Sequence, residues 1–157
     1  MYVKLIGAAA LALLAACSSG TEQDANTAGA GAATAAGPRP GSQEDLVANV
    51  GDRVLFDTDR STIRGDQRPV LDRQGAWMGR FPQVQVTVEG HADERGTREY
   101  NLALGQRRAN AARDVLVANG VASSRISTIS YGKDRPAALG SDETAWAQNR
   151  RAVTVVR

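Results

Sequence analysis

The chain has 157 residues, enough for one domain with extensions. It carries 19 Lys and Arg against 17 Asp and Glu, a formal net charge of +2, and the two signs are interspersed along the sequence. This balance gives no indication of a nucleic-acid partner. Cys17 is the only cysteine, so an intrachain disulfide is excluded.

Residues 1–16 are predicted to be a secretory signal peptide. Lys4 gives a short positive region, and residues 5–16 are all apolar or small. These twelve residues are too few for a membrane-spanning helix, which needs about 20. A cleavable signal is therefore favoured over a transmembrane helix.

Cys17 is the predicted lipid attachment site. The Leu-Ala-Ala run directly before it resembles a bacterial lipobox, in which the cysteine becomes the lipidated first residue of the mature protein. Several acyl chains give lasting membrane anchorage, since each buried methylene contributes roughly 0.8 kcal/mol. The resemblance to bacterial lipoproteins implies export to the outer membrane, with the domain facing the periplasm, because Ser18 rather than Asp follows the cysteine. The alternative is a cysteine that stands by chance near an ordinary cleavage site.

Residues 17–43 are predicted to be a flexible tether that begins at the lipidated cysteine. Of the 26 residues in 18–43, 20 are Ala, Gly, Ser, Thr or Pro, and none is a large apolar residue. Such a segment cannot bury enough surface to offset its ordering entropy. Its expected reach is roughly 30 Å as a random coil.

Residues 44–157 have the patterned composition of one two-layer domain. Apolar and alternating stretches predict strands at 53–57, 83–89, 126–131 and 152–156. Helical spacing and stop signals predict helices at about 66–81 and 98–119, with a helical turn at 143–147. The order β-α-β-α-β-(α)-β predicts an α/β (α+β) two-layer fold, with helices packed on one face of a small mixed sheet.

The loop after the second predicted strand is the most informative run of the sequence. Gly90 and Gly96 bracket it, and Thr97 is a suitable N-cap for the helix that follows. Asp93 can pair with an ammonium group, and Arg108, 15 residues later, can grip a carboxylate with two hydrogen bonds. Together they could hold a small zwitterion such as an amino-acid end. The alternative is that both side chains only form ordinary surface ion pairs, with each other or with neighbours such as Arg95.

No catalytic residue, metal or cofactor is predicted. His91 is the only histidine and lacks a second ligand cluster, so a zinc site is disfavoured and a hydrogen-bonding role in the loop is expected. The sequence also lacks a Gly-x-Ser-x-Gly or comparable nucleophile pattern. The arginine pairs 107/108 and 150/151 would by default lie on solvated faces, with their aliphatic stems packed down.

Several runs of the domain carry a family resemblance: Glu89-Gly90-His91-Ala92-Asp93-Glu94-Arg95-Gly96-Thr97, Leu104-Gly105-Gln106-Arg107-Arg108-Ala109-Asn110, Ser130-Tyr131-Gly132-Lys133 and Asn149-Arg150-Arg151-Ala152-Val153. They resemble the OmpA-like peptidoglycan-binding domain family, and more narrowly its lipoproteins of the Tol–Pal system. The resemblance extends over residues 44–157, and the signal, lipobox and tether agree with it.

The resemblance implies an OmpA-like fold that binds the stem peptide of peptidoglycan non-covalently through meso-diaminopimelate. Asp93 falls on the family's ammonium-binding aspartate and Arg108 on its carboxylate-binding arginine. Further matches line the same pocket: Phe56, Asp57, Arg95, Thr97, Asn101 and Leu104. The implied role is a tether between outer membrane and cell wall that serves envelope integrity and cell division, with TolB and other Tol proteins as partners.

Other functions stay open beside this one. An OmpA-like wall-binding lipoprotein outside the Tol–Pal system would carry a similar site. A cell-wall hydrolase would need a nucleophile or metal set that is not predicted here. A flagellar-stator relative is disfavoured, because removal of the signal leaves no membrane-spanning stretch.

Overall fold

The computed structural model describes residues 37–157, so Cys17, the predicted signal peptide and most of the predicted tether lie outside the described residues. The elements in chain order are α1 (Gln43–Asp45), η1 (Leu46–Val50), β1 (Arg53–Leu55), α2 (Arg68–Arg80), β2 (Val86–His91), α3 (Arg98–Ala118), η2 (Ser123–Arg125), β3 (Ile126–Gly132), α4 (Glu143–Asn149) and β4 (Arg151–Val156). Over this part of the chain, none of the helices combines the length and the hydropathy needed to span a membrane.

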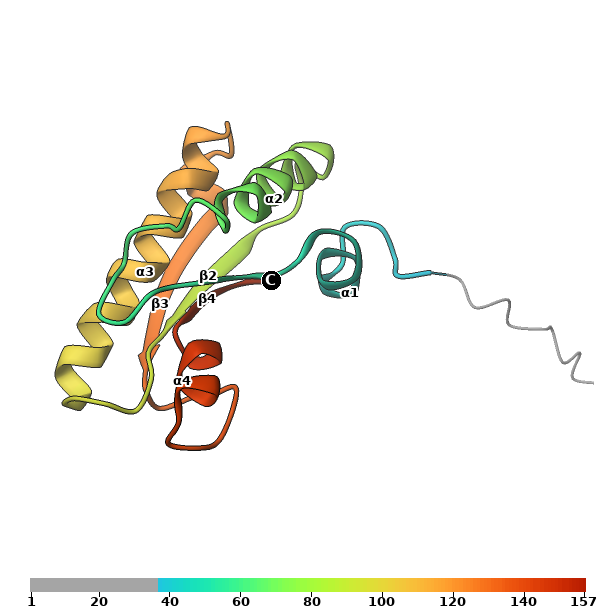
Figure 1. Ribbon diagram of the computed structural model, residues 1–157. Helices are drawn as coiled ribbons and strands as arrows, with labels where there is room; N and C mark the ends of the chain where they lie inside the picture. Colours follow the sequence, from blue (N-terminus) through green and yellow to red (C-terminus); the bar gives the residue numbers. More distant parts are fainter. Residues whose placement is uncertain (1–36) are drawn as a thin grey trace, which may run out of the picture. The chain divides into compact units, whose positions relative to one another are not determined.

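The four strands form one mixed sheet in the order β1-β4-β2-β3. β4 pairs antiparallel with both β1 and β2, whereas β2 and β3 are parallel. A parallel pair needs a long crossover, and α3 supplies it between β2 and β3. Figure 1 shows α3 lying along these strands, with α2 beside its C-terminal half. The predicted α+β two-layer fold with a small mixed sheet is confirmed.

The apolar core lies between the sheet and helices α2 and α3. Leu71, Trp77 and Met78 of α2 are buried on one face of the helix that was predicted at about 66–81, and they pack with Leu116 of α3. Full burial of each such side chain contributes roughly 1.5–3 kcal/mol. Pro69 lies in the first turn of α2, where no intrahelical hydrogen bond is lost.

Residues 43–50 form a short helical segment, α1 and η1, that the sequence pattern did not predict. Ser42 caps it by accepting a hydrogen bond from the backbone N–H of Asp45. The carboxylate of Asp45 accepts from Trp77 Nε1 at 2.9 Å, and Leu46 is fully buried. A segment this short has too few turns to show helical periodicity, so its tertiary contacts define it. Backbone contacts begin at Arg39, a few residues before Glu44.

β2 begins at Val86 rather than at the predicted Gln83, because its pairing partners end there. Val86 lies opposite Val156, near the end of β4, and opposite Ile126, the first residue of β3. In the segment before β2, the carbonyl oxygens of Met78, Phe81 and Val84 instead accept hydrogen bonds from the guanidinium of Arg125. At its other end β2 continues two residues beyond the predicted Glu89, to His91.

Gly90 brings the end of β2 into direct contact with α3. A Cβ atom on Gly90 would lie 1.8 Å from the carbonyl oxygen of Gly105, and one on Gly105 would lie 2.3 Å from the Oγ of Ser130. Real Cβ atoms do not approach other atoms this closely, so only glycine fits at these positions. This contact fixes the loop that carries Asp93 against the helix that carries Arg108.

Candidate binding site

The loop between β2 and α3 is held in place at several points. The backbone N–H of Ala92 donates to the carbonyl of Gly132, and Lys133 Nζ donates to the carbonyls of Glu94 and Gly96. Gly96 has φ +84, a conformation that favours glycine. Thr97 caps α3 by accepting from the N–H of Tyr100, as predicted. Asp93 therefore stands in a loop of defined shape.

Asp93 is buried, with 7% of its surface exposed, and has two arginine partners. Arg95 donates to both carboxylate oxygens, at 3.1 Å from Nε and 2.6 Å from Nη2. Arg150 Nη1 lies 3.4 Å from Oδ2. Burial alone would raise the pKa of Asp93, but the hydrogen bonds from Arg95, supported by that from Arg150, hold it below its ordinary value. The carboxylate is thus kept ionised.

Arg108 is fully buried in α3 and is bonded to backbone carbonyls. Nε donates to the carbonyl of Arg60, Nη1 to that of His91 and Nη2 to that of Asp57. A guanidinium has five N–H donors, so one donor on each Nη stays uncommitted in these three bonds. Burial lowers the pKa of Arg108 to about 10, against the opposing charge of Asp93, so the group is positive at neutral pH.

Asp93 and Arg108 come from different elements but share their surroundings. The Arg108 guanidinium lies 5.2 Å from the centre of the Phe56 ring, while Arg150, which contacts Asp93, donates to the Phe56 carbonyl. Among the ion pairs of the described residues, Asp93 pairs with Arg95 and with Arg150, and none includes Arg108. Of the alternative, the pairing of Asp93 with Arg95 is confirmed, although Asp93 is buried, and the mutual surface pair of Asp93 and Arg108 is wrong.

The remaining predicted residues divide by what they touch. Phe56 and Leu104 are buried, and the backbone of Asp57 holds Arg108 while its exposed carboxylate faces Arg64. Asn101 donates its side-chain amide to the carbonyl of Arg95 at 2.7 Å and so fixes the loop. Thr97 is exposed and acts as the helix cap.

Two expectations about side chains near the site are wrong. Arg108, Arg150 and Arg151 are not on solvated faces but buried, because their donors are taken up by carbonyl and carboxylate oxygens; only Arg107 is exposed as expected. His91 does not hydrogen-bond through its side chain: within residues 37–157 neither imidazole nitrogen has a hydrogen-bond partner, and its backbone carbonyl serves Arg108 instead.

A surface pocket of about 210 Å³ lies over this region, lined by Thr58, Asp59, Arg95, Gly96 and Tyr100. Asp93 and Arg108 do not line it. Arg95 does, with its side chain 40% exposed, bonded to Asp93 and lying 4.2 Å from the centre of the Trp146 ring. Arg95 thus belongs both to the lining of this pocket and to the ion pair with Asp93.

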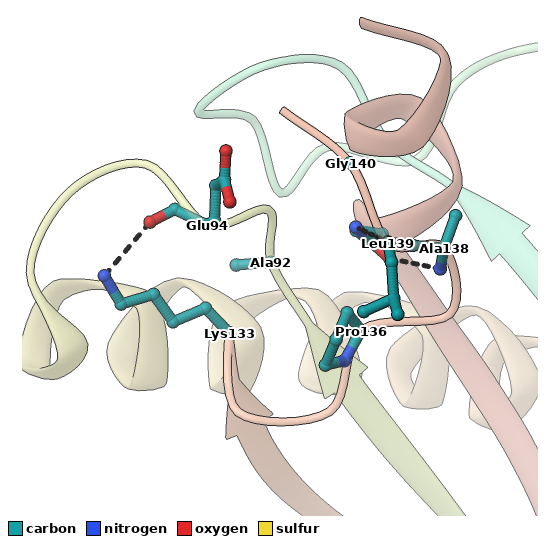
Figure 2. A pocket seen from close by; sticks show the side chains of 8 residues that line it. Ala92, Glu94, Lys133, Pro136, Ala138, Leu139 and Gly140 are labelled. Carbon is teal, nitrogen blue, oxygen red and sulfur yellow. Dashed lines mark hydrogen bonds between the residues drawn. The ribbon is translucent and has the colours of Figure 1, made fainter. Parts of the chain in front are cut away.

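A second hollow, of about 200 Å³, lies on the other side of the loop, between Ala92–Glu94 and residues 136–140 (Figure 2). Figure 2 shows Lys133 reaching the backbone carbonyl of Glu94. The side chain of Asn149 is likewise occupied, since it bonds the backbone of Ala137 and Ala138. Lys133 thus binds the loop that carries Glu94, and Asn149 binds residues 137–138 to α4, so these bonds are structural.

Comparison with known proteins gives the family. The sequence profile of the OmpA family matches residues 55–150, more than half of the chain. The chain belongs to the OmpA family. The peptidoglycan-associated lipoprotein of Mesorhizobium japonicum is 54% identical over 156 residues, covering 97% of this chain and 90% of that protein. That of Rhizobium meliloti is 59% identical over 128 residues, covering 82% of this chain and 70% of that protein.

Two solved structures share the fold. The peptidoglycan-associated lipoprotein from Burkholderia pseudomallei matches with a TM-score of 0.68 and 39% identity, covering 72% of this chain and 100% of that one. The C-terminal domain of MotB from Helicobacter pylori matches with a TM-score of 0.63 over 68% of this chain and 84% of that one, at 23% identity. The second likeness is one of fold alone.

Arg150 is the residue at this OmpA-family site that the sequence did not single out. The Asn149-Arg150-Arg151 run contributed to the family resemblance, but its spacing from residue 93 gave no sign of a contact. The only signal was the pair of adjacent arginines between a helix and a strand, which is also common on exposed surfaces.

Proposed function

We propose that this protein is an outer-membrane lipoprotein that binds peptidoglycan non-covalently through the meso-diaminopimelate of the stem peptide. Its domain would hold the cell wall while lipid on Cys17 holds the membrane. The similar proteins of Mesorhizobium japonicum, Rhizobium meliloti and Burkholderia pseudomallei, all named peptidoglycan-associated lipoproteins, support this proposal.

The observation that carries the ligand assignment is the pair of buried, opposite charges at one end of the sheet. The ionised carboxylate of Asp93 would receive the ligand ammonium in exchange for Arg95, its half-exposed partner. The two uncommitted Nη donors of Arg108 would receive the ligand carboxylate. Phe56 and Leu104 would contact the aliphatic part between the charges. The free amino-acid end of diaminopimelate has this combination of groups.

The role follows from two attachments on one chain. Once the lipid is inserted, wall binding becomes a local event with a high effective concentration, provided that residues 17–43 span the gap. A modest affinity at each site then suffices for a stable link. No chemical step on the ligand is part of this account, so the protein is proposed to be a binding module and not an enzyme.

Co-sedimentation with purified peptidoglycan tests the binding. A fragment of residues 37–157 should sediment with the wall and be released by free meso-diaminopimelate. Asp93→Ala and Arg108→Ala should each abolish this sedimentation, because either end of the zwitterion loses its buried partner. Arg113→Ala and Asp114→Ala, an exposed ion pair on the same helix, serve as controls and should bind as the wild type does. Wild-type sedimentation of both site variants would refute the assigned pocket.

Membership of the Tol–Pal system is a separate part of the proposal. Binding of purified TolB to the fragment is expected and can be measured directly. A fragment that binds the wall but not TolB would indicate instead an OmpA-like wall-binding lipoprotein outside that system. Release of soluble muropeptides from the wall by the fragment would contradict the binding-module assignment.

A further inference from the structure

The two arginines that hold Asp93 differ in how firmly they are fixed. Arg95 is the second residue along from Asp93, and its side chain is 40% exposed. The side chain of Arg150 is 6% exposed and lies between α4 and β4. Arg95 can therefore be reached from solvent, whereas Arg150 is almost completely enclosed.

Arg150 is fixed by contacts with three separate parts of the chain. Its Nε donates to the carbonyl of Phe56 at 3.1 Å, and the backbone N–H of Phe56 donates back to the carbonyl of Arg150 at 2.9 Å. Its Nη2 donates to the carboxylate of Glu143 in the first turn of α4. Its Nη1 is then directed to Oδ2 of Asp93. The guanidinium thus joins the end of β1, helix α4 and the Asp93 loop.

We propose that Arg150 is a positioning residue of the site, which keeps the Asp93 carboxylate in place after Arg95 has given way to the ligand ammonium. This rests on the proposed function. Arg150 would not touch the ligand itself. Its action is on Asp93, which without it would be a buried carboxylate with no remaining protein cation bonded to it once Arg95 leaves.

The charged groups that face Asp93 allow this role to be isolated. They are Arg95 and Glu94 in its own loop, Arg108 in α3 and Arg150 before β4, with Glu143 behind Arg150. A buried carboxylate that loses a cation takes up a proton at higher pH. Loss of Arg150 should therefore raise the pH below which the ligand no longer binds, whereas a merely structural loss would lower the unfolding temperature and leave that pH unchanged.

The test compares four variants of the 37–157 fragment, which has its own apolar core and contains the part of the chain that matches the whole of the crystallised Burkholderia pseudomallei chain. Affinity for a soluble diaminopimelate-containing tripeptide is measured by calorimetry from pH 4 to 8, and the titration of Asp93 is followed by NMR of its carboxyl carbon without ligand. Arg150→Gln should weaken binding at least tenfold at pH 7. It should also raise two midpoints by a pH unit or more: the pH at which binding is half lost and the pH at which the Asp93 carboxyl is half protonated. Arg150→Lys keeps a cation beside Asp93, so both midpoints should return most of the way to their wild-type values.

Arg151→Gln is the matched control, because Arg151 is the next residue, is also buried and, within residues 37–157, donates side-chain hydrogen bonds only to the carbonyls of Asn149 and Arg135. It should leave both midpoints in place. Glu143→Gln removes a largely exposed anchor of Arg150, so it should fold normally and weaken binding severalfold. If Arg150→Gln does not fold, Glu143→Gln decides: wild-type affinity in that variant would overturn the proposal.

Equal midpoints in Arg150→Gln and Arg151→Gln would also overturn it. These failures differ from a failure of the proposed function, in which the wild-type fragment itself would not bind the tripeptide.

Discussion

The two ends of the sheet are built in opposite ways. One end, here called the apolar end, is formed by Leu46, Trp77, Met78, Val86 and Leu116, all fully or nearly fully buried. The other, the charged end, contains the buried ionisable side chains His91, Asp93, Arg108, Arg150 and Arg151. Burial of apolar surface stabilises a fold, whereas removal of charges from water opposes it unless each charge is bonded. Apolar burial at the first end therefore offsets the free-energy cost of burying charges at the second.

The charged end remains folded because its groups are bonded to backbone as well as to each other. Arg108 alone donates hydrogen bonds to three backbone carbonyls, those of residues 57 and 60 in the loop after β1 and that of His91 at the end of β2. A guanidinium held in this way is pre-organised, so less conformational freedom is lost when a ligand carboxylate arrives. Recognition and stability are thus placed at different ends of one small domain.

The largest expected effect is at the backbone contact between β2 and α3, beside the charged end. Gly90→Ala forces a methyl group into the carbonyl of Gly105, which belongs to helix backbone and cannot move independently. The loss should exceed about 4 kcal/mol and leave little folded protein, as urea unfolding or circular dichroism would show. Gly79→Ala on α2, where a Cβ meets nothing within 4 Å, should instead be neutral or stabilising by up to about 1 kcal/mol. Similar stability in both variants would mean that β2 and α3 are not in contact.

A substitution at the apolar end should reduce stability without changing recognition. Leu116→Ala removes a fully buried side chain and should lower the free energy of unfolding by about 3 kcal/mol in urea. The exposed neighbour Val117 provides the control, since Val117→Ala should change stability by less than about 0.5 kcal/mol. Ligand affinity should be the same in both variants at temperatures where they are folded. A large affinity change in Leu116→Ala would show that the two ends are energetically coupled.

The charged end should also make the domain sensitive to acid through His91. Burial, with the nearby charges of Arg151 and Arg135, lowers the pKa of His91 to about 4, from an ordinary value of 6.5. The unfolded chain therefore binds more protons between these values, so stability is fully present above about pH 6.5 and falls as the pH drops towards 4. The loss could reach about 3 kcal/mol.

His91→Phe isolates this contribution. The buried imidazole nitrogens lack hydrogen-bond partners among the described residues, so a phenyl ring of similar shape forfeits no hydrogen bond there. The difference in unfolding free energy between pH 7.5 and pH 4.5 should be smaller in the variant than in the wild type. If both proteins lose the same stability over that interval, His91 does not stay neutral in the fold.

The apolar end was predictable from the sequence and the charged end only in part. The α2 stripe of Leu71, Trp77 and Met78 has helical spacing, so hydropathy alone identifies both the helix and its buried face. Thr97 as the cap of α3 follows from local chemistry in the same way. By contrast, Arg108 is buried because residues 57, 60 and 91 bring carbonyls to it, and no local pattern encodes that convergence.

The same reasoning explains why the sequence predicted neither the helical segment at 43–50 nor the role of Arg150 at the site. Residues 43–50 are helical because Asp45 bonds Trp77 and Leu46 enters the core, contacts that cross more than 30 positions of the chain. Arg150 meets Asp93 across 57 positions. A resemblance to the family could name Asp93 and Arg108, but the spacing of residues could not show that each has other partners in the folded protein.

The most direct test of the central claim is a comparison of two ligands on the unaltered domain. Soluble stem peptides that end in meso-diaminopimelate or in lysine differ by one carboxylate, the group assigned to Arg108. The account predicts that the diaminopimelate peptide binds in calorimetry and that the lysine peptide binds at least roughly 30-fold more weakly, because charge-assisted hydrogen bonds to one buried guanidinium are lost. Equal affinity for the two peptides would contradict it.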